Sequence, residues 1–147
     1  MLLSKSCVYG IRAALYLAVQ NRERYTPFKQ ISDSLNISFH FLTKILQVLT
    51  QAKIVESVKG PKGGVAMTQP GKTTVFDIVY AIDGSEVFDA CVLGLPNCSD
   101  DNPCSLHSIW NLTKENLKQD LQSQNLNTLA KQINDGSIRL TDIIKTV

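Results

Sequence analysis

Residues 26–69 contain two short amphipathic helices separated by a tight turn. In both helices the apolar residues recur every three or four positions, which places them on one face. Asn36-Ile37-Ser38 interrupts the first pattern, and Ser38 is a favourable N-cap for the second helix. The inward-facing residues are Phe28, Ile31 and Leu35 in the first helix and Leu42, Ile45, Leu46 and Leu49 in the second. The pattern predicts a helix-turn-helix, whose second helix can enter the major groove of DNA.

The outer face of the second helix carries the side chains that would meet a DNA duplex. His40 and Thr43 are the candidates for contacts with base edges. Ser38 and Phe39 lie at the start of the helix, and the N-terminal half of such a helix approaches the bases. Lys44 is a candidate for a phosphate or groove contact.

A short basic hairpin follows the helix-turn-helix. Residues 54–58 alternate in hydrophobicity like a strand, and residues 65–68 can return antiparallel beside them. The connecting loop, 59–64, carries two lysines but lacks the spacing and the following helix of a nucleotide-binding phosphate loop. Its residues expected to contact phosphates or a groove are Lys59, Gly60, Pro61, Lys62 and Gly63. A basic hairpin in this position predicts a winged helix that binds DNA, rather than a helix pair that serves only as core.

Charge is distributed unevenly along the 147 residues, a length typical of one domain. The net charge is only +2, but residues 1–72 hold ten Lys/Arg against three Asp/Glu, whereas residues 73–147 hold five against ten. The halves therefore carry +7 and −5. The basic half contains the helix-turn-helix, as binding to phosphates requires.

Apolar periodicity predicts further helices, so the chain is expected to be mainly α. They are residues 5–20, a helix from the N-cap Thr74 to Gly84, residues 104–123, and a short helix from the N-cap Asn127 to Asn134. Residues 85–103 are expected to form a long loop, and the tail from Ser137 a strand or turn. The predicted parts are a winged helix-turn-helix DNA-binding domain (1–84), a cysteine-containing sensor loop (85–103), and a dimerisation helix with the C-terminal tail (104–147).

The long C-terminal helix has a stripe near the spacing of a coiled-coil seam. Its members are Leu106, Trp110, Thr113, Leu117 and Leu121. Because the stripe lies beyond a domain that already has a core, we interpret it as a dimerisation surface. A homodimer would suit double-stranded DNA with a near-palindromic operator, because helix-turn-helix dimers read two half-sites about one helical turn apart.

Three of the four cysteines fall within fourteen residues, in the pattern Cys91-x6-Cys98-x5-Cys104-x2-His107. The chain shows no signal-peptide pattern and no membrane-spanning run, so we expect a cytoplasmic protein, in which structural disulfides are disfavoured. The expected helix N-terminus at Cys104 favours its thiolate. Wide spacing favours an iron–sulfur cluster over a paired-knuckle zinc site. Thiol redox sensing, zinc and no ligand remain alternatives, and Cys7 is interpreted as a buried structural thiol.

Catalysis is a weaker interpretation of the same loop. A metalloenzyme would need an acid–base group beside the metal and a substrate pocket. The nearby carboxylates are Asp89, Asp100 and Asp101, in a stretch that is expected to be solvated. We therefore expect no enzyme.

Four stretches resemble the IscR/NsrR/CymR family, the Rrf-two superfamily of bacterial winged-helix transcription regulators. They are MLLSKSCVYGIRAALYLA, the recognition-helix and hairpin segment ending in VKGPKGGVAMTQP, YAIDG, and the three-cysteine loop. The resemblance covers essentially the whole chain. It implies a dimeric repressor or activator whose operator affinity is modulated by an iron–sulfur cluster.

The resemblance also implies the cluster ligands, namely Cys91, Cys98 and Cys104. In the IscR-like case the fourth ligand matches His107; in other members it is a carboxylate of the partner chain, at a position that is Val8 here. Valine cannot ligate a metal, so this sequence favours His107, although the neighbouring Cys7 could compete. We expect 2Fe–2S rather than 4Fe–4S, and such a cluster is easily lost in air during purification. A metal-free, thiol-redox-sensing regulator is the alternative.

Overall fold

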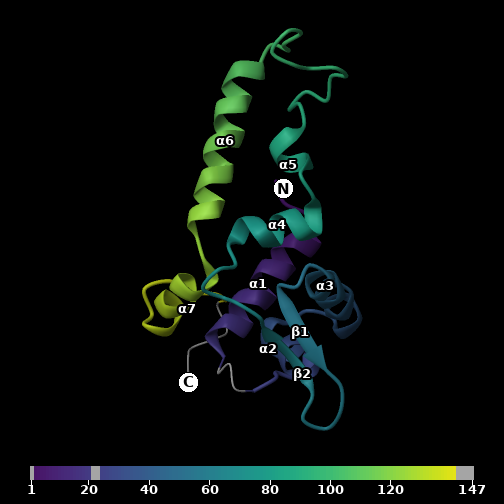
Figure 1. The fold of residues 1–147 in the computed structure, drawn as a ribbon, viewed down its shortest axis with the longest axis vertical. Helices are drawn as coiled ribbons and strands as arrows, with labels where there is room; N and C mark the ends of the chain where they lie inside the picture. The colour runs from purple at the N-terminus through teal and green to yellow at the C-terminus, as the bar shows by residue number, and fades with distance from the viewer. Residues whose placement is uncertain (1, 21–23, 142–147) are drawn as a thin grey trace.

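The computed structural model describes residues 2–20 and 24–141. Figure 1 shows an elongated molecule in which a helical base carries a two-stranded wing at one end. A long helix, α6 (His107–Ser123), extends from this base away from the wing, and the cysteine loop lies at its far end, where the helix begins in the chain. The wing and the cysteine loop thus lie at opposite ends of the molecule. No helix in the described ranges has the length and apolar character needed to cross a lipid bilayer.

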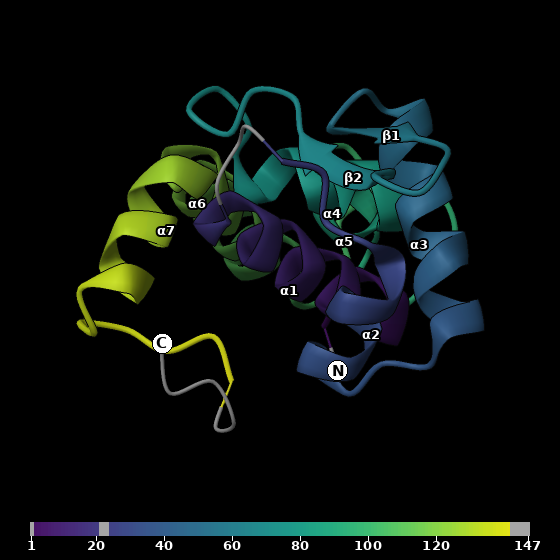
Figure 2. The same ribbon diagram turned by 90° about the horizontal axis from the view of Figure 1, so that it is seen from below.

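Helix α1 (Lys5–Val19) runs through the centre of the base. Figure 2 shows it between the C-terminal helix α7 (Leu126–Asn134) and the helix-turn-helix, and it packs against both. Ser4 caps α1 by accepting a hydrogen bond from the backbone N–H of Cys7 at 3.0 Å. The helix follows the predicted range, ending one residue earlier.

The predicted helix-turn-helix is present as α2 (Phe28–Leu35) and α3 (Phe39–Gln51). Between them Asn36 adopts a left-handed conformation with φ of 52° and ends α2. Ser38 is the N-cap of α3, as predicted, and its side chain accepts a hydrogen bond from the backbone N–H of Phe41 at 3.2 Å. The apolar faces of both helices are buried, except that Phe28 is half-buried.

The predicted hairpin forms the wing, with β1 (Val55–Val58) antiparallel to β2 (Gly64–Met67). Thr26, just before α2, pairs with Val65 through two backbone hydrogen bonds of 2.9 Å. This pairing holds the wing against the start of the helix-turn-helix.

Helix α4 (Val75–Asp83) begins at the predicted N-cap. The Thr74 hydroxyl accepts from the backbone N–H of Asp77, and the Asp77 carboxylate accepts from that of Thr74, which completes a capping box. The predicted loop 85–103 contains one helical turn that we did not predict, α5 (Glu86–Asp89). It is too short to show periodicity, and it is held by burial of Phe88 against Phe76, with ring centroids 5.0 Å apart.

The C-terminal helices begin at different residues than predicted. Helix α6 starts at His107 rather than at Cys104, because residues 104–107 form a separate turn closed by the His107 N–H and the Cys104 carbonyl. Helix α7 is capped by Asn125, not Asn127, since the Asn125 side chain accepts from the Thr128 N–H at 2.8 Å. Residues 137–141 contain no strand, and the rest of the tail lies outside the described residues.

Part of the predicted dimerisation stripe on α6 packs within its own chain. Leu117 and Leu121 pack against the core of their own chain, and the Trp110 indole N–H donates to the Ala90 carbonyl at 3.1 Å. The most exposed apolar residues of α6 are Ile109, 70% exposed, and Leu112, 64% exposed, and neither belongs to the predicted stripe. Periodicity alone could not separate the packed residues from the exposed ones, because both sets have helical spacing.

We predict that Gly64→Ala detaches the wing from α2. A Cβ at this position would lie 2.2 Å from the Thr26 carbonyl oxygen, and Gly64 has φ of +152°. The substitution should lower the free energy of unfolding by about 3 kcal/mol, as measured by urea denaturation. Gly71→Ala is the control, because nothing lies within 4 Å of its added Cβ. Equal stability of the two variants would contradict the close contact.

Candidate functional site

The three loop cysteines converge on one point. Their Sγ atoms all lie within 4.8 Å of one another, and those of Cys91 and Cys104 are 3.6 Å apart. Cys91 follows α5, Cys98 lies in the loop, and Cys104 precedes α6 by three residues. The sequence predicted these residues as a cluster, and the structure brings all three together.

Two tight turns explain why the loop folds back on itself. The Gly94 N–H donates to the Cys91 carbonyl at 3.0 Å, which closes a turn directly after the first cysteine. Ser99 and Asn102 form an isolated bridge, which reverses the chain between the second and third cysteines. These turns bring the three cysteines together although six and five residues separate them in the sequence.

His107 contacts the cysteine group through Nδ1, and its Nε2 faces two other side chains. Its Nδ1 lies 3.1 Å from the Cys98 Sγ, and its Nε2 lies 2.9 Å from an oxygen of Asp100 and 3.0 Å from the side-chain amide of Asn111. An ionised carboxylate can only accept, so Asp100 favours the proton on Nε2, and the Asn111 Nδ2, itself a donor, is then a neighbour of that N–H and not its hydrogen-bond partner. In the neutral ring this leaves the Nδ1 lone pair on the cysteine side, where a metal ligand is needed.

Two further residues of α6 support the start of the loop, a role that we did not predict for them. The Lys114 Nζ donates to the carbonyls of Asp89 and Ala90 at 3.3 and 3.2 Å, and Trp110 donates to the same Ala90 carbonyl. His107, Asn111 and Lys114 follow one another at four and three residues. That spacing could have indicated a polar face directed at the cysteines.

The loop makes the cysteines chemically unequal. Hydrogen bonding from the backbone of Leu95, with a smaller contribution from Leu93, lowers the pKa of Cys91 to about 7. The backbone of Cys104 lowers the pKa of Cys98, but desolvation and the neighbouring Cys104 and Cys91 outweigh this and leave that pKa raised. Cys91 is therefore the thiol of these two that ionises more readily.

Cys7 stands apart from this group. It is fully buried in the core of the base, and burial, followed by the charge of Asp83, raises its pKa to about 12. It therefore stays a protonated thiol at neutral pH. These properties agree with the predicted structural role.

The donor set suits a soft metal centre. Three thiolates and one imidazole are ligands of zinc and of iron–sulfur clusters. A single tetrahedral ion with metal–sulfur bonds of about 2.3 Å would hold its sulfurs about 3.8 Å apart, and the separations here are of that order. Two irons would spread the same ligands over two metal atoms, so a cluster would require the loop to open around it. The prediction that Cys104 lies at a helix N-terminus is wrong, since α6 begins three residues later at His107.

The residues predicted to face DNA lie together at the other end of the molecule. Phe39, His40 and Lys44 are exposed on α3, and Thr43 is half-buried with its hydroxyl donating to the Phe39 carbonyl at 2.8 Å. Ser38 is exposed at the helix start, where its side chain serves as the cap. This face of α3 can therefore approach a DNA groove.

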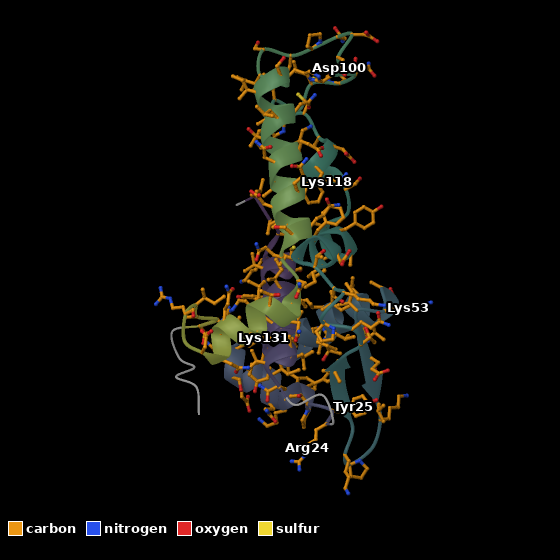
Figure 3. All side chains as sticks on the ribbon, turned by 60° about the vertical axis from the view of Figure 1, so that its left-hand side comes forward. Arg24, Tyr25, Lys53, Asp100, Lys118 and Lys131 are labelled. Atoms are coloured by element: carbon orange, nitrogen blue, oxygen red, sulfur yellow. The ribbon has the colours of Figure 1, made fainter. Side chains whose placement is uncertain are left out.

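The tip of the wing is also accessible. Residues 59–62 are exposed, and the Gly63 N–H donates to the Gly60 carbonyl at 2.9 Å, which closes the turn. Figure 3 shows Arg24 and Tyr25 at the wing end of the molecule. We did not predict that Arg24 would belong to this basic face. The Tyr25 hydroxyl donates to the carboxylate of Glu56 on β1 at 3.1 Å, so this acidic side chain is hydrogen-bonded within the protein.

The chain is similar to known proteins over most of its length. The profile of the Rrf2 family, described as an iron-dependent transcriptional regulator, matches residues 3–132. An HTH-type transcriptional regulator of Aquifex aeolicus is 34% identical over 125 residues, covering 83% of each chain. The solved structure of T. potens IscR has a TM-score of 0.75 at 25% identity, covering 92% of this chain and 90% of that one. CymR, the global cysteine regulator of B. subtilis, gives 0.73 at 25% identity, covering 88% and 95%.

We predict that Cys91 is alkylated faster than Cys98 in the reduced, metal-free protein near neutral pH. The thiolate is the reactive form and is present above the pKa, so a pKa of about 7 makes it abundant near neutrality. We expect about a tenfold difference with iodoacetamide, measured by mass spectrometry of the peptides. The rates should become similar in urea, and faster alkylation of Cys98 in the folded protein would contradict the assigned hydrogen bonds.

Proposed function

This chain belongs to the Rrf2 family of DNA-binding transcriptional regulators, and we propose that it acts as a dimer whose operator affinity responds to an iron–sulfur cluster. The family consists of regulators, not enzymes. The donor set supports the proposal: three thiols and the His107 imidazole lie together, in a chain that also carries a winged helix. Their present spacing suits a single ion, and a cluster would spread them further apart.

The proposed ligands are Cys91, Cys98, Cys104 and His107. The imidazole favours 2Fe–2S over 4Fe–4S, because histidine replaces cysteine on one iron in known two-iron centres. A bound cluster would supply one-electron redox chemistry, and the cluster itself can be lost from the site. The protein itself supplies three soft thiolate ligands from one loop and a histidine that is oriented by Asp100.

Backbone contacts connect this loop to the DNA-binding elements. At the foot of α6, the Val75 N–H donates to the Gln124 carbonyl and the Leu126 N–H donates to the Thr73 carbonyl, both at 3.0 Å. Helix α4, which starts there, packs against α1 and α3. We propose that ordering the loop fixes α6 relative to the recognition helix. Such coupling requires a different operator affinity in the two states.

Dimerisation is proposed through the outward face of α6, where Ile109 and Leu112 are exposed. Two recognition helices related by a two-fold axis would read the half-sites of a near-palindromic operator. On each half-site we assign base-edge contacts to α3 and phosphate or groove contacts to Lys44 and the wing. The basic N-terminal half supplies the positive charge that this contact needs.

The wing assignment predicts a loss of affinity that does not depend on DNA sequence. Replacing Lys59 and Lys62 by alanine should weaken binding to operator and random duplex alike, and should reduce the salt slope by about 2. Fluorescence anisotropy at several salt concentrations measures this. Lys131→Ala is the control, because Lys131 is exposed on α7, away from the wing (Figure 3). An unchanged slope would rule out phosphate contacts by the wing.

The cluster proposal is tested on protein purified without oxygen. We expect visible charge-transfer absorbance with about two irons and two sulfides per chain, as a 2Fe–2S centre requires. Cys98→Ser should abolish the absorbance, and Cys7→Ser should keep it. Operator affinity is then compared between loaded and metal-free wild type. Equal affinity, or no cluster after reconstitution with iron and sulfide, would contradict the proposal.

A metal-free thiol switch is the second candidate, favoured by the 3.6 Å separation of the Cys91 and Cys104 sulfurs. Hydrogen peroxide would take two electrons and two protons from the two thiols, giving one disulfide and two molecules of water. The structural similarity to CymR, the global cysteine regulator of B. subtilis, agrees with a sulfur-linked role. Peroxide-dependent, dithiothreitol-reversible operator release without iron would support this candidate over the cluster.

A further inference from the structure

Lys114 is a buried cation without a carboxylate partner. Its relative exposure is only 8%, and its Nζ reaches two backbone carbonyls, those of Asp89 and Ala90. Among the described residues, none of the ion pairs involves Lys114. Lysine is almost never buried without a compensating negative charge, since taking an ammonium out of water is costly. The position therefore indicates an anionic group that the two carbonyls do not supply.

The missing charge lies beside it. Lys114 lines the same cavity of about 40 Å³ as all three loop cysteines, His107 and Asp89, and among the described residues the Asp89 carboxylate forms no ion pair with it. Within the described lining of this cavity, Lys114 is the one lysine or arginine. The Ala90 carbonyl that it holds belongs to the residue before Cys91, so the ammonium is anchored at the entrance to the ligand loop.

Metal loading makes this cavity anionic. Three thiolates carry three negative charges, and a divalent ion or an oxidised 2Fe–2S core carries two positive charges, which leaves one negative charge. Reducing the cluster by one electron adds another. In a partly buried site with a low effective dielectric constant, a neighbouring cation stabilises each added negative charge more than it would in water.

We propose that Lys114 is the counter-cation of the cysteine site, which stabilises the thiolate–metal state and favours the reduced over the oxidised cluster. It is a positioning residue rather than a ligand, because it acts through charge and through its hold on the Ala90 carbonyl. For the cluster this inference rests on the proposed function, but for a single metal ion it does not.

The test uses two neutral variants. Lys114→Met removes the charge and the hydrogen bonds, whereas Lys114→Gln removes the charge and retains an N–H donor for the carbonyls. Lys131→Met is the control: it removes an exposed lysine of α7 that lines none of the described pockets containing a loop cysteine, whereas Lys118 lines a pocket shared with Cys98 and His107 and is unsuitable. Thermal unfolding of the metal-free proteins checks that each variant is folded.

The first readout is the affinity of the reduced, metal-free chain for Co²⁺, followed by its thiolate charge-transfer absorbance in competition with a chelator. We expect both neutral variants to bind at least about tenfold more weakly than wild type, and Lys131→Met to bind like wild type. Wild-type affinity in Lys114→Gln would overturn the inference. If Lys114→Met alone were weakened, the hydrogen bonds and not the charge would be responsible, which would also overturn it.

The second readout is the midpoint potential of the reconstituted cluster. Losing the cation should make reduction less favourable by about a factor of ten, which is a shift of about 59 mV to more negative potential for one electron. An unchanged potential in both neutral variants would contradict the charge role. If wild type took up no cluster but the Co²⁺ affinities followed the expected order, the proposed function would fail while the role of Lys114 would stand.

Discussion

Close packing of α1 against α3 and α4 at Gly10 is the contact on which the rest of the structure depends. A Cβ at this position would lie 2.2 Å from Cδ1 of Ile82 on α4 and 3.4 Å from Cγ2 of Ile45 on α3. An added Cβ would displace the tip of the Ile82 side chain, so glycine lets that side chain pack directly on α1. Because α3 is the candidate recognition helix and α4 leads toward the cysteine loop, one buried contact joins the two functional ends of the molecule.

Distance is the main mechanical feature of this architecture. The cysteine loop lies at the far end of α6 from the wing, so a small change in the loop can influence DNA binding only through rigid elements (Figure 1). Helix α6 is rigid, and its foot is fixed to the start of α4 by two backbone hydrogen bonds. The capping box of Thr74 and Asp77 strengthens the same junction. In the proposed function, this junction is where a change in the loop becomes a change in the orientation of the recognition helix.

Electrostatics follow the same division. The wing and the outer face of α3 present lysines toward solvent, which suits a polyanion that approaches from outside. The cysteine site instead has one buried ammonium and the His107 imidazole on a small cavity, and the Asp100 carboxylate meets His107 from the solvent side. The first arrangement is open and sensitive to salt, whereas the second is enclosed and less screened. Positive charge is thus used for binding at one end and, as we infer, for tuning a metal site at the other.

The sequence by itself determined the local elements, because helix periodicity, caps such as Ser38 and Thr74, and the glycines of the wing act over a few residues. It also identified the three cysteines and His107, since reactive residue types at close spacing are visible without a fold. Tertiary structure decided what local signals could not. Helix α5 is held by the packing of Phe88 on Phe76, two residues that lie too far apart for a local sequence pattern to link them. Leu117 and Leu121 of the predicted α6 stripe pack against the core only because the base of the molecule covers them. The place of Lys114 depends on a carbonyl 24 residues away in the chain, and no local pattern contains that information.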